Sequence, residues 1–465
     1  MRYRRKILWA ICSGVTLSFL CGLPAGDLEG AAPPPMHVGV ATADITPEQG
    51  AAHDPLLAKA VVFRQGACQA ALVMCDVCIV SSDLSGLARQ AAMDTTGIPA
   101  ANIAVAATHT HTGTTARKDA AERIADAVAR AQQAARPVQL QAGMAEQKET
   151  ISFNRRYLMK DGTIRFNPGV LNPDIVRPVG PIDPGVGILL FRDAASGKPL
   201  ASLTNFALHL DTVGKYDEFS ADYPYYLDRE LKKEFGDHFV SVFGTGTCGD
   251  VNHVDVTRPN LRWKQTRGQT MLVPFSPKPT DASPSPITTE YLGAALAATV
   301  KAAVPHLRAC ARPSLAARSE TIQAPLATFS EMDRAWAREA GGKEMSFLMR
   351  IRASRIRALE GLRQKYGETM PVEVQAFRLC EDTAIVAIPG EVFVELGLAI
   401  KKGSPFAHTL VIELANTREM SYVPTRKAFC EGDYEVVNSR LESGGGEMMV
   451  EAALRMLKHL HEEKP

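Results

Sequence analysis

The sequence predicts an α/β fold. Short apolar runs rich in β-branched residues, which are typical of strands, alternate with alanine-rich runs of helical periodicity. The helical runs end at a proline or a glycine, and polar residues follow directly after several strand-like runs. An order of strand, helix, strand and helix at this spacing favours an α/β architecture.

The first part of the chain contains the clearest elements. In order, we expect a strand over 37–47, a hairpin over 58–80, a helix over 81–97, a strand over 102–113 and a helix over 118–137. Pro47 ends the first strand, and the hairpin turns near Gln65–Gly66. The last helix is amphipathic and stops at Pro137.

The remaining elements continue the α/β pattern. We expect paired strands over 185–193 and 200–209 and a helix over 223–236. A strand that begins at 238 runs into a polar, glycine-rich loop over 244–256, and a helix follows over 287–307. The segment 257–286 is rich in Pro, Ser, Thr and Lys, and we expect an irregular surface loop there. The charged segment 330–367 predicts a helical insertion with a solvated face. The length of the chain alone would allow two or three domains.

The N-terminus has the pattern of a secretory signal peptide. A basic "MRYRRK" precedes the apolar "ILWAICSGVTLSFLCGL", and small residues and prolines follow in "PAGDLEGAAPPP". We interpret residues 1–30 as a signal peptide and a small-residue linker, so we expect export to the periplasm or the medium. The alternative interpretation of the same residues is a retained N-terminal membrane anchor.

The nearly equal numbers of positive and negative residues argue against a strongly charged partner. The chain has 52 Lys and Arg against 51 Asp and Glu. This balance gives no electrostatic reason to expect a nucleic acid or a strongly acidic membrane surface as partner, and it suits a small-molecule or weakly charged substrate, such as a neutral lipid. Peripheral contact with a membrane is compatible with it, and the oligomeric state is left open.

Nine cysteines are present, of which Cys12 and Cys21 lie in the leader. Seven is odd, so at least one thiol of the mature chain is free or pairs between chains. Cys75 and Cys78 form a CxxC inside the apolar run "ALVMCDVCIV", and we interpret them as small buried residues. The spacing of the other five predicts no pairing.

Residues that bind metals follow several predicted strands. His109 and His111 are two apart in "ATHTHTG", so on an extended chain both face the same side, where imidazoles can share an ion. His209 ends "NFALH" in the same fashion, and Glu391 follows a glycine in "IPGEVF". Each of these residues alone also fits a structural role.

Taken together, seven motifs give the chain a resemblance to the neutral/alkaline, non-lysosomal ceramidases, which are zinc amidases that cut the N-acyl bond of ceramide. The motifs are "VGVATADIT", "ATHTHTG", "FNRR", "NFALH", "GDVN", "IPGEVF" and "SYVPTR…DYE", in the family's order from Val38 to Tyr434. The resemblance covers the family's catalytic domain. It implies a single domain over 36–465, in which mixed β-sheets pack between helices in a four-layer α/β/β/α arrangement.

By position, the resemblance implies one zinc ion held by His109, His209, Glu391 and Tyr422. Two imidazoles, a carboxylate and a phenol would leave a coordination position open for water or a carbonyl oxygen.

The resemblance also implies residues that act on the substrate. His111 matches a second active-site histidine that acts as an acid or base, and Arg155 and Tyr434 match residues beside the reacting amide. A guanidinium and a phenol there would stabilise the developing oxyanion. From its place after a strand, Asp76 is a candidate for supporting the site.

The sequence departs from the family at two places. The family keeps its nucleophilic serine in the loop equivalent to "GDVN", where this chain has Asn252, and an amide is not a usable nucleophile. His253 and Asp255 follow it with a spacing of two and are candidates for an added metal ligand. In addition, only about thirty residues follow Tyr434, so we expect no C-terminal immunoglobulin-like domain.

These observations lead to two hypotheses. The first is an exported zinc-dependent hydrolase of an N-acyl amide, ceramide-like or another acyl substrate, in which metal-activated water attacks and Asn252 hydrogen-bonds water or substrate. The alternative is a catalytically degenerate, zinc-containing protein of the same fold with a binding or structural role.

Overall fold

The structure is a computed structural model that describes residues 34–113, 118–213, 218–257, 262–266, 269–273, 288–340 and 345–463. The predicted signal peptide lies outside these residues, so the structure does not test it. Within the described residues, no helix is both long enough and apolar enough to cross a membrane.

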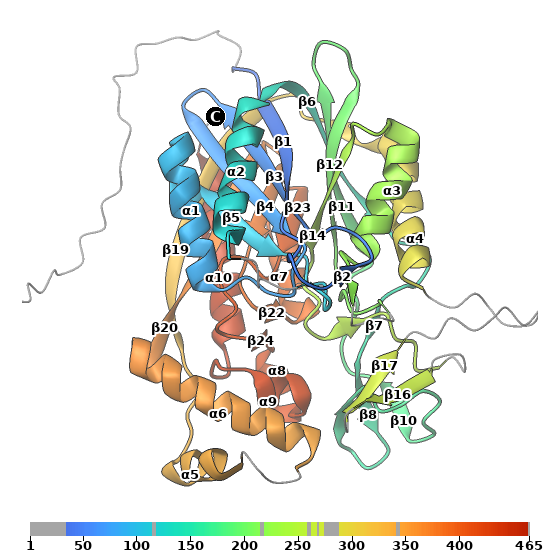
Figure 1. Ribbon diagram of the computed structural model, residues 1–465, viewed down its shortest axis with the longest axis vertical. Coiled ribbons are helices and arrows are strands. Elements are labelled where there is room, and N and C mark those ends of the chain that lie inside the picture. Colours follow the sequence, from blue (N-terminus) through green and yellow to red (C-terminus); the bar gives the residue numbers. More distant parts are fainter. Residues whose placement is uncertain are drawn as a thin grey trace, which may run out of the picture. The chain divides into compact units, whose positions relative to one another are not determined.

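A large mixed sheet forms one of the two inner layers (Figure 1). Its strand order is β14 (Val240–Thr245), β12 (Pro199–Phe206), β11 (Gly185–Asp193), β6 (Arg136–Glu146), β1 (His37–Asp44), β3 (Leu57–Gln65), β4 (Cys68–Cys75) and β5 (Ile103–Ala107), and β18 (Arg308–Ala309) pairs with β6. The predicted hairpin over 58–80 forms β3 and β4, and the predicted pair over 185–209 forms β11 and β12. The pairs β12–β14 and β4–β5 are parallel.

A smaller sheet forms the second inner layer. Its order is β19 (Pro313–Pro325), β20 (Thr369–Cys380), β21 (Thr383–Ala387) and β23 (His408–Ile412), with β21 and β23 parallel. Side chains such as Phe63 and Leu72 from the large sheet and Phe377 and Leu410 from the small one share a single buried core. The two sheets therefore pack face to face.

Helices cover the outer face of each sheet. On the large sheet these are α1 (Ser82–Thr96), α2 (Ala120–Gln133), α3 (Tyr223–Phe235) and α4 (Thr289–Ala303). On the small sheet they are α6 (Phe347–Tyr366), α7 (Val394–Gly403) and α10 (Gly445–Glu462). Two helical layers around two sheets give a four-layer α/β/β/α arrangement, so the predicted fold class is confirmed.

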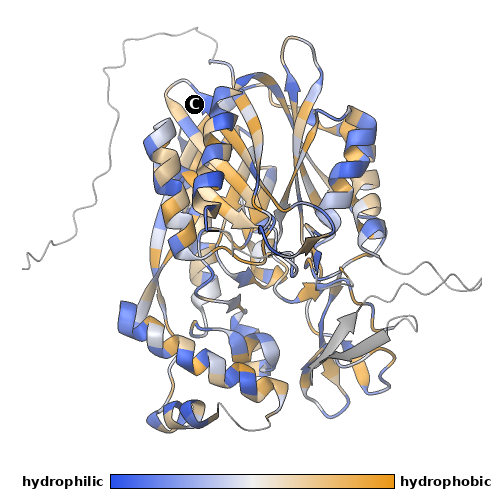
Figure 2. Ribbon diagram, in the orientation of Figure 1, coloured by the Kyte–Doolittle hydropathy of each residue, from blue (hydrophilic) through white to orange (hydrophobic). Residues whose placement is uncertain are grey.

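The burial of both sheet faces explains the long apolar runs in the sequence. Along β3, Val61 and Phe63 enter the core between the sheets, whereas Ala60 and Val62 pack under the helices. A strand with both faces buried is apolar at consecutive positions rather than at alternate ones. In Figure 2 the central strands are accordingly mostly hydrophobic, while α5 (Glu331–Glu339) and α6 carry many hydrophilic residues.

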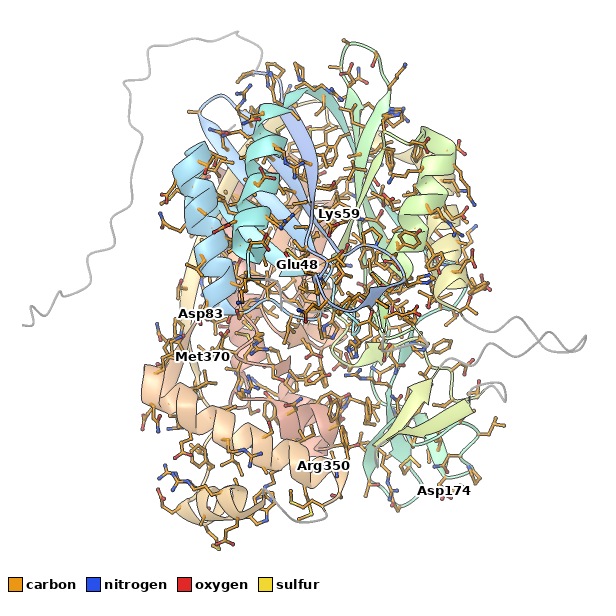
Figure 3. All side chains as sticks on the ribbon, viewed as in Figure 1. Glu48, Lys59, Asp83, Asp174, Arg350 and Met370 are labelled. Carbon is orange, nitrogen blue, oxygen red and sulfur yellow. A yellow bond between two sulfur atoms is a disulfide. The ribbon has the colours of Figure 1, made fainter. Side chains whose placement is uncertain are left out.

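A buried lysine interrupts this apolar interior. Lys59 of β3 is buried, and its Nζ donates a 3.0 Å hydrogen bond to the carbonyl oxygen of Ser241 on β14 (Figure 3). Burial raises the pKa of the Asp76 carboxyl to about 6, and the positive charge of Lys59 partly offsets this increase. The carboxylate of Asp76 accepts bonds from Leu57 N and Thr108 Oγ1, so it joins the strands that lead to His109.

Shorter elements complete the fold. They are β2 (Ala51–Ala52), β7 (Phe153–Asn154), β8 (Arg156–Met159), β9 (Ile164–Phe166), β10 (Ile175–Pro178), β13 (Glu218–Phe219), β15 (Val251–Asn252), β22 (Glu391–Val392), β24 (Tyr422–Val423), α8 (Arg426–Glu431), α9 (Tyr434–Asn438) and the 3-10 turns η1 (Ala100–Asn102) and η2 (Val304–His306). Within 257–286 the structure describes one hairpin, β16 (Arg262–Thr266) and β17 (Gln269–Val273). The segment 330–367 contains α5 and α6.

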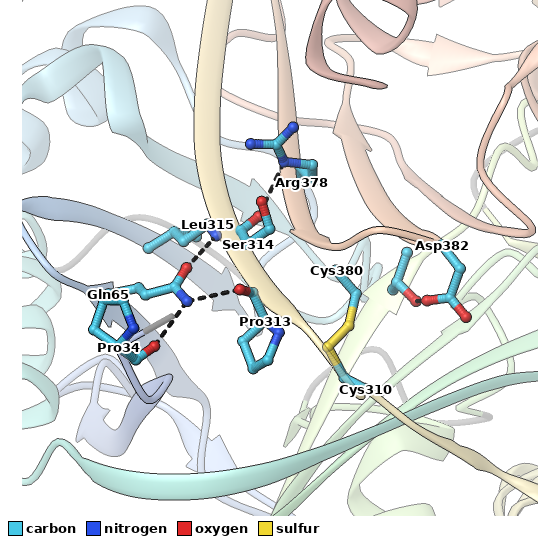
Figure 4. The surroundings of a disulfide bond; sticks show 10 residues. Pro34, Gln65, Cys310, Pro313, Ser314, Leu315, Arg378, Cys380 and Asp382 are labelled. Carbon is cyan, nitrogen blue, oxygen red and sulfur yellow. Dashed lines mark hydrogen bonds between the residues drawn. A yellow bond between two sulfur atoms is a disulfide. The ribbon is translucent and has the colours of Figure 1, made fainter. Parts of the chain in front are cut away.

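One disulfide fastens the small sheet. Cys310, which follows β18, is bonded to Cys380 at the end of β20 (Figure 4). Beside it, Gln65 Nε2 donates to the carbonyl oxygen of Pro313, and Gln65 Oε1 accepts from Leu315 N. These bonds tie the start of β19 to the β3–β4 turn. The cysteines Cys68, Cys75, Cys78, Cys248 and Cys430 are free.

Candidate metal centre and active site

Five strands end close together, and their following loops build the candidate site. The ends of β5, β12, β14, β21 and β23 are joined by backbone hydrogen bonds from Ala107 N to Leu414 O, from Gly246 N to Phe206 O and from Ile388 N to Ile412 O. The ends of strands are where α/β proteins place their sites. The two sheets are joined there, because Glu413 N donates to Thr245 O at 3.0 Å. Thr245 Oγ1 in turn donates to Thr108 O at 2.6 Å.

His109 follows β5 and is held in one orientation. Its φ of 79° turns the chain sharply after the strand, and its backbone N donates to Val77 O. Its Nδ1 lies 2.7 Å from the carbonyl oxygen of Cys78. A carbonyl oxygen only accepts hydrogen bonds, so Nδ1 carries the proton and the Nε2 lone pair faces the site.

His209 is fixed in the same way after β12. Its Nδ1 lies 3.1 Å from Cys248 O, so its Nε2 also presents a lone pair. The two Nε2 atoms are only 3.0 Å apart. Two lone pairs that face each other at this distance repel, and a cation that both can coordinate relieves the repulsion.

Glu391 completes this cluster. Gly390 precedes it with φ 83°, and a Cβ at that position would lie 2.8–2.9 Å from Met420, Val423 and Ser421, so only glycine allows the approach. Glu391 Oε2 lies 3.4 Å from His109 Nε2 and 3.8 Å from His209 Nε2, and it is buried without a hydrogen-bond partner. Burial alone would raise the pKa of this carboxyl, but the neighbouring His109 lowers it well below the usual value.

Tyr422 stands beside Glu391 because β22 and β24 pair in parallel with these two residues in register. The phenol is buried, and its oxygen accepts a 3.1 Å hydrogen bond from Arg155 Nη2. His109, His209, Glu391 and Tyr422 are thus brought together from four separate segments. Two imidazole nitrogens, an unpaired buried carboxylate oxygen and a phenol fit a zinc ion.

Arg155 lies directly against the cluster. Its Nη1 is 3.4 Å from His209 Nε2, while Nη2 donates to Gly249 O and to Tyr422. The rings of Phe166, Tyr422 and Tyr434 surround the guanidinium at 4.9, 5.5 and 6.0 Å. Burial alone would lower the pKa of the guanidinium, but the neighbouring Tyr422 and Glu435 raise it well above its usual value, so the group is charged.

Glu435 fixes Arg155 and its neighbour. It is fully buried, and its two oxygens bind Arg155 Nε at 2.9 Å and Arg156 Nη1 at 3.0 Å. Arg156 also reaches Glu431 and Gly432 O. Sequence reasoning missed Glu435, although it adjoins Tyr434 in "DYE".

Tyr434 separates the metal cluster from a cavity of about 820 Å³. Its ring lies 5.4 Å from that of Tyr422 and 4.8 Å from that of Phe166. Burial raises the pKa of its phenol. Residues of the β8–β9 hairpin, of the start of α6 and of α8–α9 line the cavity; they include Ile164, Arg165, Phe166, Phe347, Leu348, Glu431, Asp433, Tyr434 and Val437. The lining of the cavity therefore contains both apolar and charged side chains.

Asn252 lies in β15, which pairs with β7, and its side chain is buried. Its Oδ1 accepts from Val254 N at 3.0 Å, and its Nδ2 lies 3.4 Å from Asn167 Oδ1. Both ends of the amide are thus engaged by the chain itself.

His111 is exposed at the edge of the cluster. Its ring meets those of His109 and His209 edge-on, with centroid separations of 4.9 and 5.2 Å. Its backbone N donates to Leu210 O at 2.9 Å, which places the two histidine loops side by side.

An ion pair not foreseen from the sequence adjoins these loops. His253 Nδ1 lies 2.9 Å from Asp211 Oδ1. Burial would raise the pKa of Asp211, but the imidazoles of His253, His209 and His111 lower it well below its usual value. Asp255, which the spacing had grouped with His253, accepts hydrogen bonds from Thr257 instead. The sequence offered one sign that Asp211 lies near the site, because Asp211 follows the candidate ligand His209 by two residues.

Two further buried carboxyls support the loops. Glu413 accepts from Cys248 Sγ and from Val392 N, and burial raises its pKa to about 8. Asp250 accepts from Val394 N and Asn154 Nδ2 at 2.8 Å each. Both carboxyls hold backbone that leads to a candidate ligand.

No protein-family model and no curated protein matches the chain. Among solved structures it is similar to the neutral ceramidase from Pseudomonas aeruginosa, with a TM-score of 0.67, 18% identity and coverage of 93% of this chain and 75% of that chain. It is also similar to a structure described as ceramidase complexed with C2, with a TM-score of 0.65, 18% identity and coverage of 92% and 76%. At this identity the likeness shows a ceramidase-like fold.

Proposed function

We propose that this chain is a zinc-dependent hydrolase of an N-acyl amide, with ceramide or another acyl compound as substrate. The observation that carries the proposal is the convergence of His109 Nε2, His209 Nε2 and the unpaired Glu391 Oε2. An unpaired buried carboxylate oxygen is costly, and a bound cation removes that cost.

The residues around the cluster suit acyl transfer. When bound, zinc would polarise a carbonyl and lower the pKa of a water molecule to about 7. Arg155, held by Glu435 and three aromatic rings, is positioned to stabilise negative charge on the carbonyl oxygen, and Tyr434 lies on the same side. His111 is exposed where it can exchange a proton with a bound substrate.

The cavity beside Tyr434 supports an amphipathic substrate. Phe166, Phe347 and Leu348 offer apolar contact, while Arg165 and Asp433 offer polar contact. Leu348 and Met349 are 37% and 44% exposed at the start of α6, where peripheral contact with a membrane would bring them to the lipid.

A degenerate, zinc-containing binding protein is the second candidate. Asn252 favours it, because this residue has no hydroxyl and its amide is bonded to Asn167 and Val254. Against it, Arg155, His111 and Tyr434 all surround the cluster, and an idle buried guanidinium contributes little stability. The hydrolase with water as nucleophile is therefore the better conclusion.

Export is part of the proposal. The N-terminal basic and apolar runs support it, and so does the Cys310–Cys380 disulfide, because such bonds persist in oxidising compartments.

A metal-dependent hydrolysis assay tests the proposed function. The zinc-loaded protein should release the fluorescent acyl group of a short-chain N-acylsphingosine, a chelator should stop the reaction, and added zinc should restore it. His209→Ala should lose zinc and turnover together, whereas His459→Ala, at an exposed position of α10, should keep both. A zinc-loaded wild-type protein that hydrolyses no member of an acyl-amide and ester panel would refute the hydrolase and favour the binding protein.

A further inference from the structure

The CxxC motif of the sequence contains two thiols with different surroundings. Cys75, at the end of β4, is buried in the core under the helices, and burial raises the pKa of its thiol. Cys78, three residues later, is half-buried, and both cysteines are free. The prediction of two small buried residues is therefore confirmed for Cys75, whereas the thiol of Cys78 is accessible.

The backbone places Cys78 beside the first histidine loop. Strands β4 and β5 are parallel neighbours, and each is followed by one of the two loops concerned. Thr108 N donates to Cys75 O at 2.8 Å, and His109 N donates to Val77 O at 3.0 Å. These hydrogen bonds hold the two loops together.

Cys78, His109 and His111 form a second group of potential metal ligands. Each residue offers one ligand atom, and these atoms all lie within 4.8 Å of one another. Cys78 Sγ is 3.8 Å from His109 Nδ1, and the ring centroids of His109 and His111 are 4.9 Å apart. A tetrahedral ion with bonds of about 2.0–2.3 Å holds its donor atoms roughly 3.3–3.6 Å apart. Because Cys78 is half-buried and His111 is exposed, the group can close onto an ion by side-chain movements of about 1 Å.

The sulfur atom distinguishes this group from the metal cluster already described. That cluster offers nitrogen and oxygen ligands, from His109, His209, Glu391 and Tyr422. A cysteine sulfur is a soft ligand, and together with imidazole it favours soft ions such as Cu⁺ and Cd²⁺. The two groups therefore differ in the class of ion that each prefers.

We propose that Cys78, His109 and His111 form an inhibitory site for a soft metal ion such as Cu⁺ or Cd²⁺. Both groups include His109, so an ion in this site withdraws that imidazole from the metal cluster. The Cys78 thiol gives its proton to solvent as the sulfur coordinates the ion, and water completes the coordination. The inhibition rests on the proposed hydrolase function, whereas the binding of the soft ion does not.

The test adds Cd²⁺ to the zinc-loaded full chain, because Cd²⁺ is not reduced or oxidised and its bond to a thiolate absorbs ultraviolet light. A slight excess of Cd²⁺ should produce the thiolate-to-cadmium absorbance and release about one zinc per cadmium bound. Hydrolysis of the short-chain N-acylsphingosine should fall at least ~10-fold at the same time.

Three variants assign the binding to the group. Cys78→Ser should not show the absorbance, and it should keep its zinc at the same concentration of Cd²⁺. His111→Ala should keep its zinc content but bind Cd²⁺ at least ~10-fold more weakly. Cys68→Ser is the matched control, because Cys68 is a free, half-buried thiol like Cys78 but begins β4, at the opposite end of the strand, so this variant should behave as the wild type.

The outcomes separate this site from the proposed function. A wild type without the thiolate absorbance, or a Cys78→Ser protein that shows it, would overturn the site. The site would also be overturned if zinc stayed bound while the absorbance appeared, or if His111→Ala bound Cd²⁺ as tightly as the wild type. A wild type that shows the absorbance and releases zinc but hydrolyses no substrate would support the metal site and refute the proposed function.

Discussion

Replacing Glu435 by Ala should destabilise the protein strongly. This carboxylate is fully buried, and the two guanidinium groups that it binds, on Arg155 and Arg156, are 3% and 1% exposed. Arg156 keeps Glu431 after the substitution, but among the described residues Arg155 has no other ion-pair partner. Breaking a buried ion pair from one side leaves an uncompensated charge and costs about 3–5 kcal/mol.

The conservative variant separates the charge from the hydrogen bonds. Glu435→Gln keeps an acceptor for one guanidinium but removes the negative charge, so it should cost about 1.5–3 kcal/mol. Glu320→Ala is the control, because the ion pair of Glu320 with Arg455 lies at the surface, with side chains 33% and 51% exposed. Removing that pair should cost less than about 1 kcal/mol.

Urea unfolding followed by circular dichroism at pH 7 measures all three variants under the same conditions. The expected order of lost unfolding free energy is Glu435→Ala, then Glu435→Gln, then Glu320→Ala. A Glu435→Ala protein within about 1 kcal/mol of the wild type would refute the view that this carboxylate neutralises the two arginines. Proposed roles of Arg155 that depend on its fixed position would then lose their support.

Three further predictions concern the disulfide, a buried carboxyl and a glycine. Cys310→Ser should lower the free energy of unfolding by about 4 kcal/mol under oxidising conditions, because the bond closes a loop with a sequence separation of 70; equal stability of the variant and the wild type would contradict this. Burial raises the pKa of Asp76 from 3.8 to about 6, so its contribution to stability is present at low pH and is lost as the pH rises between these values. The free energy of unfolding of Asp76→Asn, relative to the wild type, should therefore rise by up to about 3 kcal/mol between pH 4 and pH 7 in urea titrations. A difference between the two proteins that does not change with pH would be inconsistent with this. Gly249→Ala would place a Cβ 2.5 Å from Glu391 O, so we expect at least ~10-fold weaker zinc binding by competition with a chromophoric chelator, and unchanged affinity would show that the loop gives way.

Local patterns in the sequence predict much of the fold. The hairpin over 58–80, the helices over 81–97 and 118–137 and the paired strands over 185–209 form within a few residues of the expected bounds. Their signals are local: periodicity, turn residues and helix-ending prolines or glycines. The order of the strands in the two sheets is not a local property, and only the resemblance indicated the layers.

The candidate metal ligands also meet through contacts that are not local in the sequence. His109, His209, Glu391 and Tyr422 follow different strands, and no spacing along the chain indicates that they meet. The resemblance selected them, and the structure brings them together. The disulfide was not predicted because its two cysteines are 70 residues apart, with nothing in either local segment to select the partner.

The pairing of His253 shows why a spacing rule fails in a loop. A spacing of two places side chains on one side only where the chain is extended. After β15 the side chains of Asn252 and Asp255 bond to the backbone N atoms of Val254 and Thr257, which turns the chain. His253 therefore faces Asp211 of another loop rather than Asp255.

The zinc content of the purified protein tests the central claim most directly. Protein produced with zinc in the medium should contain about one zinc per chain by inductively coupled plasma mass spectrometry. His109→Ala and Glu391→Ala should each contain almost none, while His459→Ala should match the wild type. A folded wild-type protein that contains no zinc, or a Glu391→Ala protein that keeps all of it, would contradict the metal centre.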